Sequence, residues 1–315
     1  MNLSEIAKAF SGEADNDSKY RRIQNFFAKY PLCFDTIARA IARSLPKGKW
    51  ILTLDRTNWE YGKTVINLLV LAVVYNGTAV PLLWMPLNKK GNSDTAERIK
   101  LIKRFIALFG REQISYLTAD REFIGEEWLS WLLEMQIPIN LRIKKNTLLE
   151  EENGQREQIW KKFNAIPVGT KRCLIDVRIW GCTVNIEGMR LKDGQYLIVL
   201  STAKFGIINS YKKRWNIETM FGNLKSRGFR FEDTHLKDVE RISKLLALLA
   251  LIFCYILQIG AWQIAQGNTI VFKKTLQRPL KSIFRHGLDY LRTLYLNAQE
   301  KMQLIELIPE FLSCT

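Results

Sequence analysis

Three acidic residues occupy places where carboxylates could act together on metal ions. Asp55 closes the apolar run "KWILTLD" (49–55), and Asp120 closes "QISYLTAD" (113–120). Glu218 is the one acid in "YKKRWNIETMFGNLKS" (211–226), a basic stretch with helical spacing. Clustered carboxylates repel one another and burial raises their pKa values, so divalent cations would have to neutralise them. Such oxygen ligands suit Mg²⁺, and two Mg²⁺ ions could drive an in-line displacement at phosphorus.

The predicted helix that starts at Tyr211 also carries a cationic stripe. Tyr211, Arg214, Glu218 and Lys225 follow one another at intervals of three, four and seven residues. At about 100° per residue, these intervals direct the four side chains within roughly 60° of one another. The basic side chains of Arg214 and Lys225 would hold phosphates on either side of a scissile bond. Tyr211 would stack on a base or hydrogen-bond a phosphate. Weaker candidates for contacts to the DNA backbone are Lys212, Lys213 and Arg227.

The elements around these residues follow the order of a ribonuclease H-like α/β fold. Two apolar runs joined by Asn76–Gly77 predict a hairpin directly after the first strand. In such a fold the first and fourth strands are neighbours, which would bring Asp55 and Asp120 side by side while a helix across that edge supplies Glu218. The remaining elements are predicted as strands at 64–75, 78–87, 113–120 and 137–144 and helices at 93–110 and 125–136.

The rest of the chain divides around this core. An antiparallel β insert is predicted between Asp120 and Glu218, from strand-like segments at 171–180, 182–188 and 195–202. A long apolar helix is expected at about 237–262. The predicted regions are a helical DNA-binding region (1–47), the first part of the core (48–144), the insert (145–208), the second part of the core (209–265) and a basic helical C-terminal region (266–315).

Composition points to a polyanionic partner. The 315 residues carry a formal charge of +16, with 47 Lys and Arg against 31 Asp and Glu. An excess of this size indicates nucleic acid or an anionic membrane surface. The five cysteines form no C-x-x-C pair and there are only two histidines, which disfavours a zinc site, a disulfide framework or a histidine-based triad.

One segment resembles a membrane span. The stretch "LLALLALIFCYILQIGAW" (245–262) is apolar but of marginal length, and Gln258 interrupts it. A buried helix of a large core explains it equally well, and we favour that interpretation over a membrane protein. The N-terminus lacks the pattern of a secretory signal, so we expect a cytoplasmic, nucleoid-associated location.

In these acidic and basic residues and their spacing, the sequence resembles the DDE transposases of the bacterial insertion-sequence-four group. That family has a Tyr-x2-Arg-x3-Glu-x6-Lys signature, and residues 211–225 match it in full. The stretches "LTLDRTNW" around Asp55 and "LTADREF" around Asp120 resemble the family's other two motifs. The family's β insert fits the segment between Asp120 and Glu218, and the resemblance covers roughly residues 17–290.

The resemblance implies a DNA transposase with Asp55, Asp120 and Glu218 as catalytic and metal-binding residues. Such an enzyme binds the terminal inverted repeats of its element, cleaves them by two-metal phosphoryl transfer and joins the 3′ ends to target DNA. It implies two Mg²⁺ per site, with Mn²⁺ able to substitute, and a homodimer on double-stranded DNA. Relatives pass through a hairpin intermediate, which the resemblance permits here.

Besides the membrane protein considered above, two alternative functions remain open from the sequence. The chain could be an inactive or repurposed DNA-binding relative of a transposase, although all three acids are present. It could be a ribonuclease H-like nuclease that cleaves without joining, although the stripe of Tyr211, Arg214 and Lys225 favours transposition. Residue by residue, an isolated aspartate is often a turn residue, and a basic helix with one acid is often an ion-paired surface helix.

Overall fold

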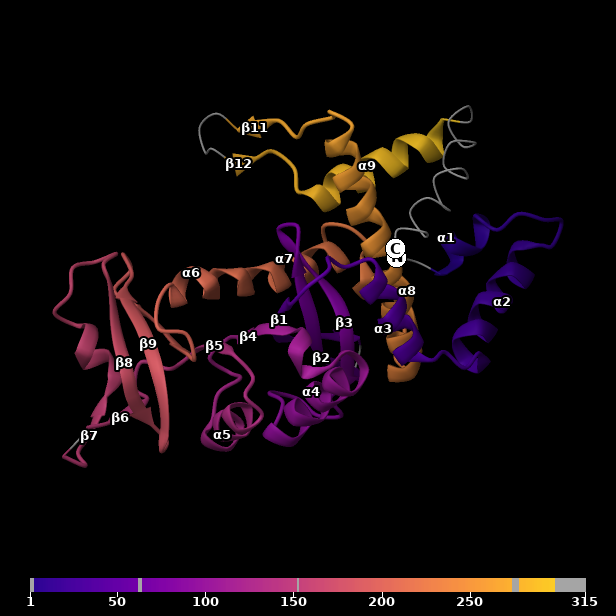
Figure 1. Cartoon of the computed structure of the whole chain (residues 1–315). Coiled ribbons are helices and arrows are strands. Elements are labelled where there is room, and N and C mark those ends of the chain that lie inside the picture. The colour runs from indigo at the N-terminus through magenta and orange to yellow at the C-terminus, as the bar shows by residue number, and fades with distance from the viewer. Residues whose placement is uncertain (1–2, 62–63, 152, 274–277, 298–315) are drawn as a thin grey trace.

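The fold is built on one large mixed sheet with helices around it, as seen in the computed structural model, which describes residues 3–61, 64–151, 153–273 and 278–297 (Figure 1). The ten strands lie in the order β3-β2-β1-β4-β5-β10-β9-β8-β6-β7. The predicted mixed α/β class is therefore confirmed. The strands are β1 (Trp50–Tyr61), β2 (Thr64–Tyr75), β3 (Thr78–Pro86), β4 (Ile114–Ala119), β5 (Ile139–Arg142), β6 (Leu148–Glu150), β7 (Arg156–Gln158), β8 (Lys171–Ile179), β9 (Cys182–Arg190) and β10 (Tyr196–Ser201).

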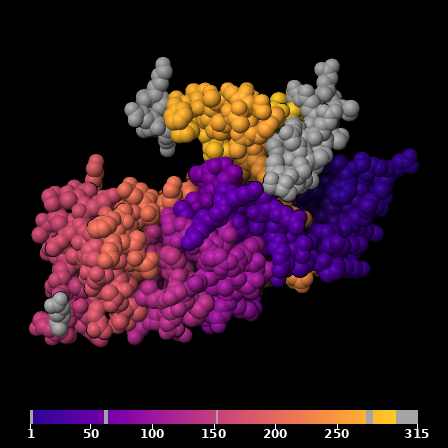
Figure 2. Space-filling view, viewed as in Figure 1, coloured from indigo at the N-terminus to yellow at the C-terminus, as the bar shows by residue number. Residues whose placement is uncertain are grey.

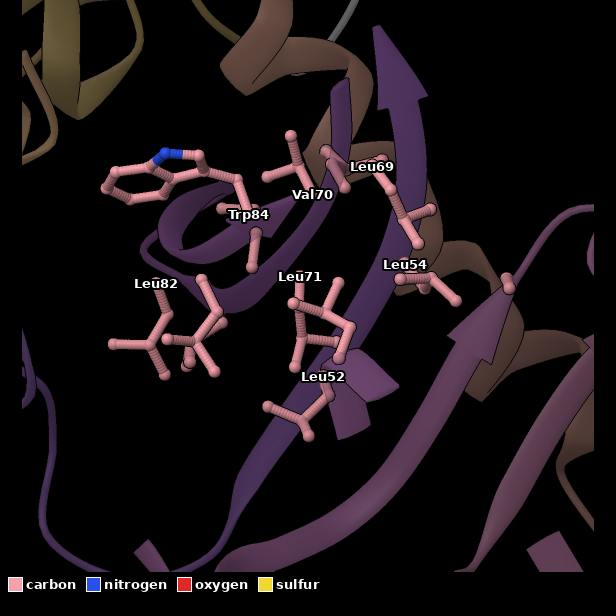
Figure 3. Close-up of a cluster of buried hydrophobic side chains, with 14 of the residues drawn as sticks. Leu52, Leu54, Leu69, Val70, Leu71, Leu82 and Trp84 are labelled. Atoms are coloured by element: carbon pink, nitrogen blue, oxygen red, sulfur yellow. The ribbon is translucent and has the colours of Figure 1, made fainter. Parts of the chain in front are cut away.

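The first three strands form an antiparallel meander, and β4 joins β1 in parallel. The turn between β2 and β3 has positive φ at Asn76 (48°) and Gly77 (75°), as the hairpin signal predicts. Strand β2 is almost wholly buried, which explains its continuous apolar sequence. Figure 3 shows the cluster of leucine, valine and tryptophan side chains that β1, β2 and β3 bury together. The predicted adjacency of the first and fourth strands is therefore present.

Two helices complete the first half of the sheet. Helix α4 (Thr95–Phe109) begins with a capping box in which Asp94 and Glu97 exchange side-chain-to-backbone hydrogen bonds, and Gly110 ends it. Helix α5 (Glu126–Glu134) then leads into β5, which is parallel to β4. These connections fix β1, β4 and β5 side by side, with their carboxyl ends at one edge of the sheet.

The strands between Asp120 and Glu218 continue the core sheet. Strand β10 pairs antiparallel with both β5 and β9, and β9 pairs antiparallel with β8. The strands predicted at 171–180, 182–188 and 195–202 therefore form β8, β9 and β10. The name "the insert" is used below for residues 145–208. The division of the chain into five regions remains a prediction.

The long helix α8 connects the meander with the N-terminal helices and with the C-terminal part of the chain. Helix α8 (Val239–Ala265) contacts β3, α2 (Asn16–Lys29), α3 (Phe34–Arg43) and α9 (Ile283–Leu296), and α1 (Leu3–Lys8) packs on α2. Figure 2 shows α9 and its neighbouring segments projecting from the body. The predicted helical character of 266–315 is wrong at 272–273 and 278–279, because β11 (Phe272–Lys273) and β12 (Arg278–Pro279) pair as antiparallel strands. The part of that prediction beyond residue 297 lies outside the described residues.

Helix α8 contains the segment that resembles a membrane span. It is long and apolar enough to cross a bilayer, but 61% of its most apolar window is buried inside the protein. Near its start, the buried Lys244 donates to the carbonyl of Phe27 at 3.1 Å and pairs with Glu240 at 3.1 Å. Such packing is that of a core helix, which agrees with the interpretation favoured from the sequence.

Candidate active site

Asp55 and Asp120 lie side by side because β1 and β4 are parallel and in register. The last paired residues are Leu54 and Ala119, so each aspartate is the next residue of its chain. Each carboxylate accepts the backbone N–H of the residue that follows it, at 2.8 Å in both cases. The predicted pair of aspartates therefore has the same local geometry on two neighbouring strands.

One feature of this prediction is wrong. Asp55 does not end its strand, because β1 continues to Tyr61 by pairing with β2 alone. Only the pairing with β4 stops beside Asp55, since β4 itself ends at Ala119. Asp55 and Asp120 therefore lie where β4 ends beside β1. The α6–α7 segment crosses the sheet at this edge.

The segment that carries Glu218 consists of two helices and a tight turn. Helix α6 (Ile207–Tyr211) passes through a 3₁₀ turn at Lys212–Arg214 into α7 (Trp215–Leu224), which packs on β3, β1 and β2. In Figure 1 this run leads from the insert toward β1. The spacing that predicted one continuous helix therefore holds only from Trp215 to Leu224.

Arg214 is the centre of the site. Its side chain is 5% exposed, and its guanidinium donates to Glu218 Oε1 at 2.5 Å while lying 3.8 Å from Asp55 Oδ2. The guanidinium also lies 5.8 Å from the ring centre of Tyr211. Its Nε–H is buried and has no hydrogen-bond partner among the described residues. Two of the three acids are thus joined by one cation that retains a free donor.

The third acid is held by Tyr211. The Tyr211 hydroxyl donates to Asp120 Oδ1 at 3.3 Å, and this tyrosine is 6% exposed. Arg142, the last residue of β5, lies 3.6 Å from the same carboxylate oxygen. The sequence prediction missed Arg142, although it ends the strand parallel to β4 and the strand-end argument applies to it as well.

A second missed residue, the acid Glu122, links the two aspartate segments. Its carboxylate accepts from Arg56 Nε at 3.1 Å, and Arg56 directly follows Asp55. The buried Arg98 of α4 donates to the backbone carbonyl of Glu122 at 3.1 Å. The only sequence signal for Glu122 was its place in the "LTADREF" stretch.

Burial dominates the electrostatics of the site. Desolvation raises the pKa of Asp55 from 3.8 to about 7, against the hydrogen bond from Arg56 and the charge of Arg214. Desolvation also raises the pKa of Tyr211, which keeps the phenol protonated as a donor. Burial opposes the charge of Arg214, yet Tyr211, Glu218 and Asp120 hold the pKa of this guanidinium above its ordinary value.

The donor set suits a hard divalent cation, but its spacing is set by Arg214. Three carboxylates are the oxygen ligands that Mg²⁺ prefers, and the poorly solvated Asp55 would gain most from a cation. Within the described ranges, however, no three His, Cys, Asp or Glu side chains lie close enough to share one ion. The guanidinium group of Arg214 lies between the carboxylates of Asp55 and Glu218.

The other predicted basic residues differ in their surroundings. Lys212 and Lys213 are exposed on the 3₁₀ turn, and Arg227 is exposed beyond α7. Lys225 does not continue the predicted stripe, because α7 ends at Leu224. It folds back onto β1 and is engaged by Glu232 at 2.7 Å, the carbonyl of Asn58 at 3.2 Å and the ring of Trp59 at 5.6 Å.

Comparison with known families identifies the class of protein. Residues 46–256 match the family described as "Transposase DDE domain", and this match spans well over half of the chain. The chain belongs to that family. The matched region includes Asp55, Asp120 and Glu218. No curated protein matches the chain.

Solved structures show more distant similarities. The piggyBac transposase in a synaptic complex with hairpin DNA is similar at 12% identity and a TM-score of 0.45, over 82% of this chain and 55% of that chain. The catalytic core domain of HTLV-2 integrase in complex with magnesium is similar at 19% identity and a TM-score of 0.24, over 30% of this chain and 61% of that chain. Endonuclease V from Bacillus subtilis is similar at 11% identity and a TM-score of 0.29, over 82% and 98%.

Proposed function

We propose that this chain is a divalent-metal-dependent transposase that binds the terminal inverted repeats of its element, cleaves them and joins the 3′ ends to target DNA. One observation carries the proposal. Asp55, Asp120 and Glu218, which are far apart in the sequence, converge on Arg214 and Tyr211. All three acids lie within residues 46–256, which match the transposase family, and this supports the proposal.

The three carboxylates are the residues that hold the metal in this proposal. Bound divalent cations supply a Lewis acid and an activated water or 3′-hydroxyl for displacement at phosphorus, with Mg²⁺ as the expected metal and two ions as the expected number. The contact between Arg214 and Glu218 would open for this, because the guanidinium lies between the carboxylates of Asp55 and Glu218, where the cation would bind. A bound cation would also favour the charged form of Asp55, whose pKa is raised by burial in the absence of a cation.

Arg214 and Tyr211 bind the DNA strand. A guanidinium that leaves Glu218 can make charge-assisted hydrogen bonds to a phosphate, and its Nε–H is already without a partner among the described residues. The Tyr211 phenol remains a donor beside Asp120. The exposed Lys212, Lys213 and Arg227 contact the DNA backbone outside this pair.

The remaining parts of the proposal follow from charge and from the need to hold two ends. A formal charge of +16 suits phosphate contacts, so affinity for DNA falls steeply with salt. Two element ends are held by two copies of the chain, which makes a homodimer on DNA the expected assembly. A protein with this partner acts at the nucleoid in the cytoplasm.

The test uses labelled double-stranded element ends, taken from the inverted repeats that flank the reading frame. In Mg²⁺ or Mn²⁺, the wild-type protein should nick these ends and join them to a target plasmid. Glu218→Gln should bind the ends normally and lose nicking and joining by at least about 10³-fold, because it removes a metal-binding carboxylate. Glu134→Gln, at an exposed acid of α5, is the matched control.

Each outcome separates one alternative. Unchanged nicking by Glu218→Gln would refute the role given to this residue. Nicking without joining by the wild type would identify a nuclease. Binding with neither reaction in either metal would identify an inactive DNA-binding relative.

A further inference from the structure

Helix α6, which carries Tyr211 at its last position, begins without a cap from its own sequence. The residue before it, Gly206, has a φ of 69° and no side chain that could accept a backbone N–H. The first N–H groups of a helix have no partner within the helix. Ile207 and Ile208 are both fully buried at this start, so water does not supply the acceptor.

Glu187 of β9 supplies the missing acceptor from across the sheet. Its Oε2 accepts the backbone N–H of Ile208 at 2.5 Å, and its Oε1 accepts from Cys173 Sγ at 3.7 Å. Glu187 is 6% exposed and lies opposite Val199 of β10 in the strand register. A buried carboxylate is stabilised by such donors and by the N-terminal end of a helix.

The far end of α6 is fixed as well. The hydroxyl of Tyr116, on the strand that leads to Asp120, donates to the carbonyl of Ser210 at 3.1 Å. Between the two ends, Val199, Ile207, Ile208 and Tyr211 form their own buried cluster. Helix α6 is therefore attached to β9 and β10 of the insert at its start and to β4 of the core at its end.

We infer that Glu187 is a positioning residue for the cleavage site. By holding the start of α6, it sets the position from which the Tyr211 hydroxyl meets Asp120. It touches none of the three carboxylates and takes no part in the chemistry itself. This inference deepens the proposed function and rests on it.

The experiment compares variants in the full-length chain. Glu187→Ala should lower the rate of end nicking at saturating DNA by about tenfold to a hundredfold, which is typical of a small displacement at a reacting centre. Glu187→Gln retains a side-chain oxygen that can accept the Ile208 N–H, and it should recover most of the rate. Glu134→Ala, at an exposed acid of α5, should leave the rate unchanged.

Two further measurements separate positioning from general stability. Hydrogen exchange of the peptide 206–211 should accelerate in Glu187→Ala, while exchange in α8 stays as in the wild type. In a Tyr211→Phe background, Glu187→Ala should cost much less than it does alone, because both changes act through the same hydroxyl. If Glu187→Ala does not fold, Glu187→Asp, which withdraws the carboxylate by one methylene, takes its place in both measurements.

The outcomes distinguish this inference from the proposed function. A wild-type protein that fails to nick DNA overturns the transposase proposal, and exchange at 206–211 then decides alone whether Glu187 holds α6. Unchanged exchange in Glu187→Ala overturns the inference. So does an equal loss of rate with and without the Tyr211 hydroxyl.

Discussion

Replacing Asp55 by asparagine should stabilise the metal-free protein at neutral and alkaline pH. Burial raises the pKa of this carboxyl group from 3.8 to about 7, although Arg56 and Arg214 both favour its charged form. Its side chain is 19% exposed, so solvent screens it only in part. A site prepared for a cation thus holds a carboxylate whose charge is costly when the cation is absent.

The shift in the pKa of Asp55 sets the size of the stability gain in Asp55→Asn and the pH range in which it appears. A difference of roughly three pKa units corresponds to at most about 4 kcal/mol. Asparagine also removes a neighbour of Arg214, so we expect a net gain of about 1–3 kcal/mol near pH 8. Between 3.8 and about 7 the folded wild type binds more protons at Asp55 than the unfolded chain does. The stability contributed by the protonated form is therefore complete below 3.8 and is lost as the pH rises to about 7.

Urea unfolding in a chelator measures this effect. Asp55→Asn and the wild type are compared at about pH 5 and about pH 8, with Asp193→Asn as a control at an exposed turn. The advantage of Asp55→Asn should grow with pH, and added Mg²⁺ should narrow it by stabilising the wild type. The burial argument would be refuted if Asp55→Asn were no more stable than the wild type at the higher pH. It would also be refuted if the gain in the free energy of unfolding were the same at both pH values.

Three further predictions concern a DNA contact and the packing of the C-terminal part. Lys225→Ala should weaken binding of element ends more than it slows nicking, and should reduce the salt slope of binding by about one. Glu232→Gln should strengthen binding because it releases Lys225, and equal affinities of both variants in a salt titration would contradict this. Gly287→Ala should lower the free energy of unfolding by about 1–3 kcal/mol, since a Cβ there would lie 2.1 Å from the Ile256 carbonyl. A wild-type melting curve for Gly287→Ala would show that α8 and α9 can separate at no cost.

Local signals in the sequence were sufficient for most of the sheet. Continuous apolar runs are typical of strands buried on both faces, and β2 is one of these. The Asn76–Gly77 pair and the capping residues of α4 fixed the ends of their elements through contacts within a few residues. The adjacency of Asp55 and Asp120 followed from strand order alone, because parallel neighbours end at the same edge.

Features that depend on contacts between distant segments were not predictable. The outer half of β1 persists because β2 pairs with it, and no signal near Asp55 shows this. The helix of Tyr211 is interrupted and ends at Leu224, where the following backbone turns so that Lys225 meets Asn58 and Glu232. The predicted stripe assumed one continuous helix from Tyr211 to Lys225, whereas the chain passes through a 3₁₀ turn at Lys212–Arg214 and α7 ends at Leu224.

The position of Arg214 connects metal binding with DNA binding in the proposed enzyme. Without either partner, this buried guanidinium is paired with the carboxylates of Glu218 and Asp55. Cations at the carboxylates would remove the partners of Arg214 and leave a buried charge, which is costly. A phosphate would restore a partner to Arg214, since both its released donors and its free Nε–H can bind phosphate oxygens. In the proposed enzyme, each ligand therefore lowers the cost of binding the other.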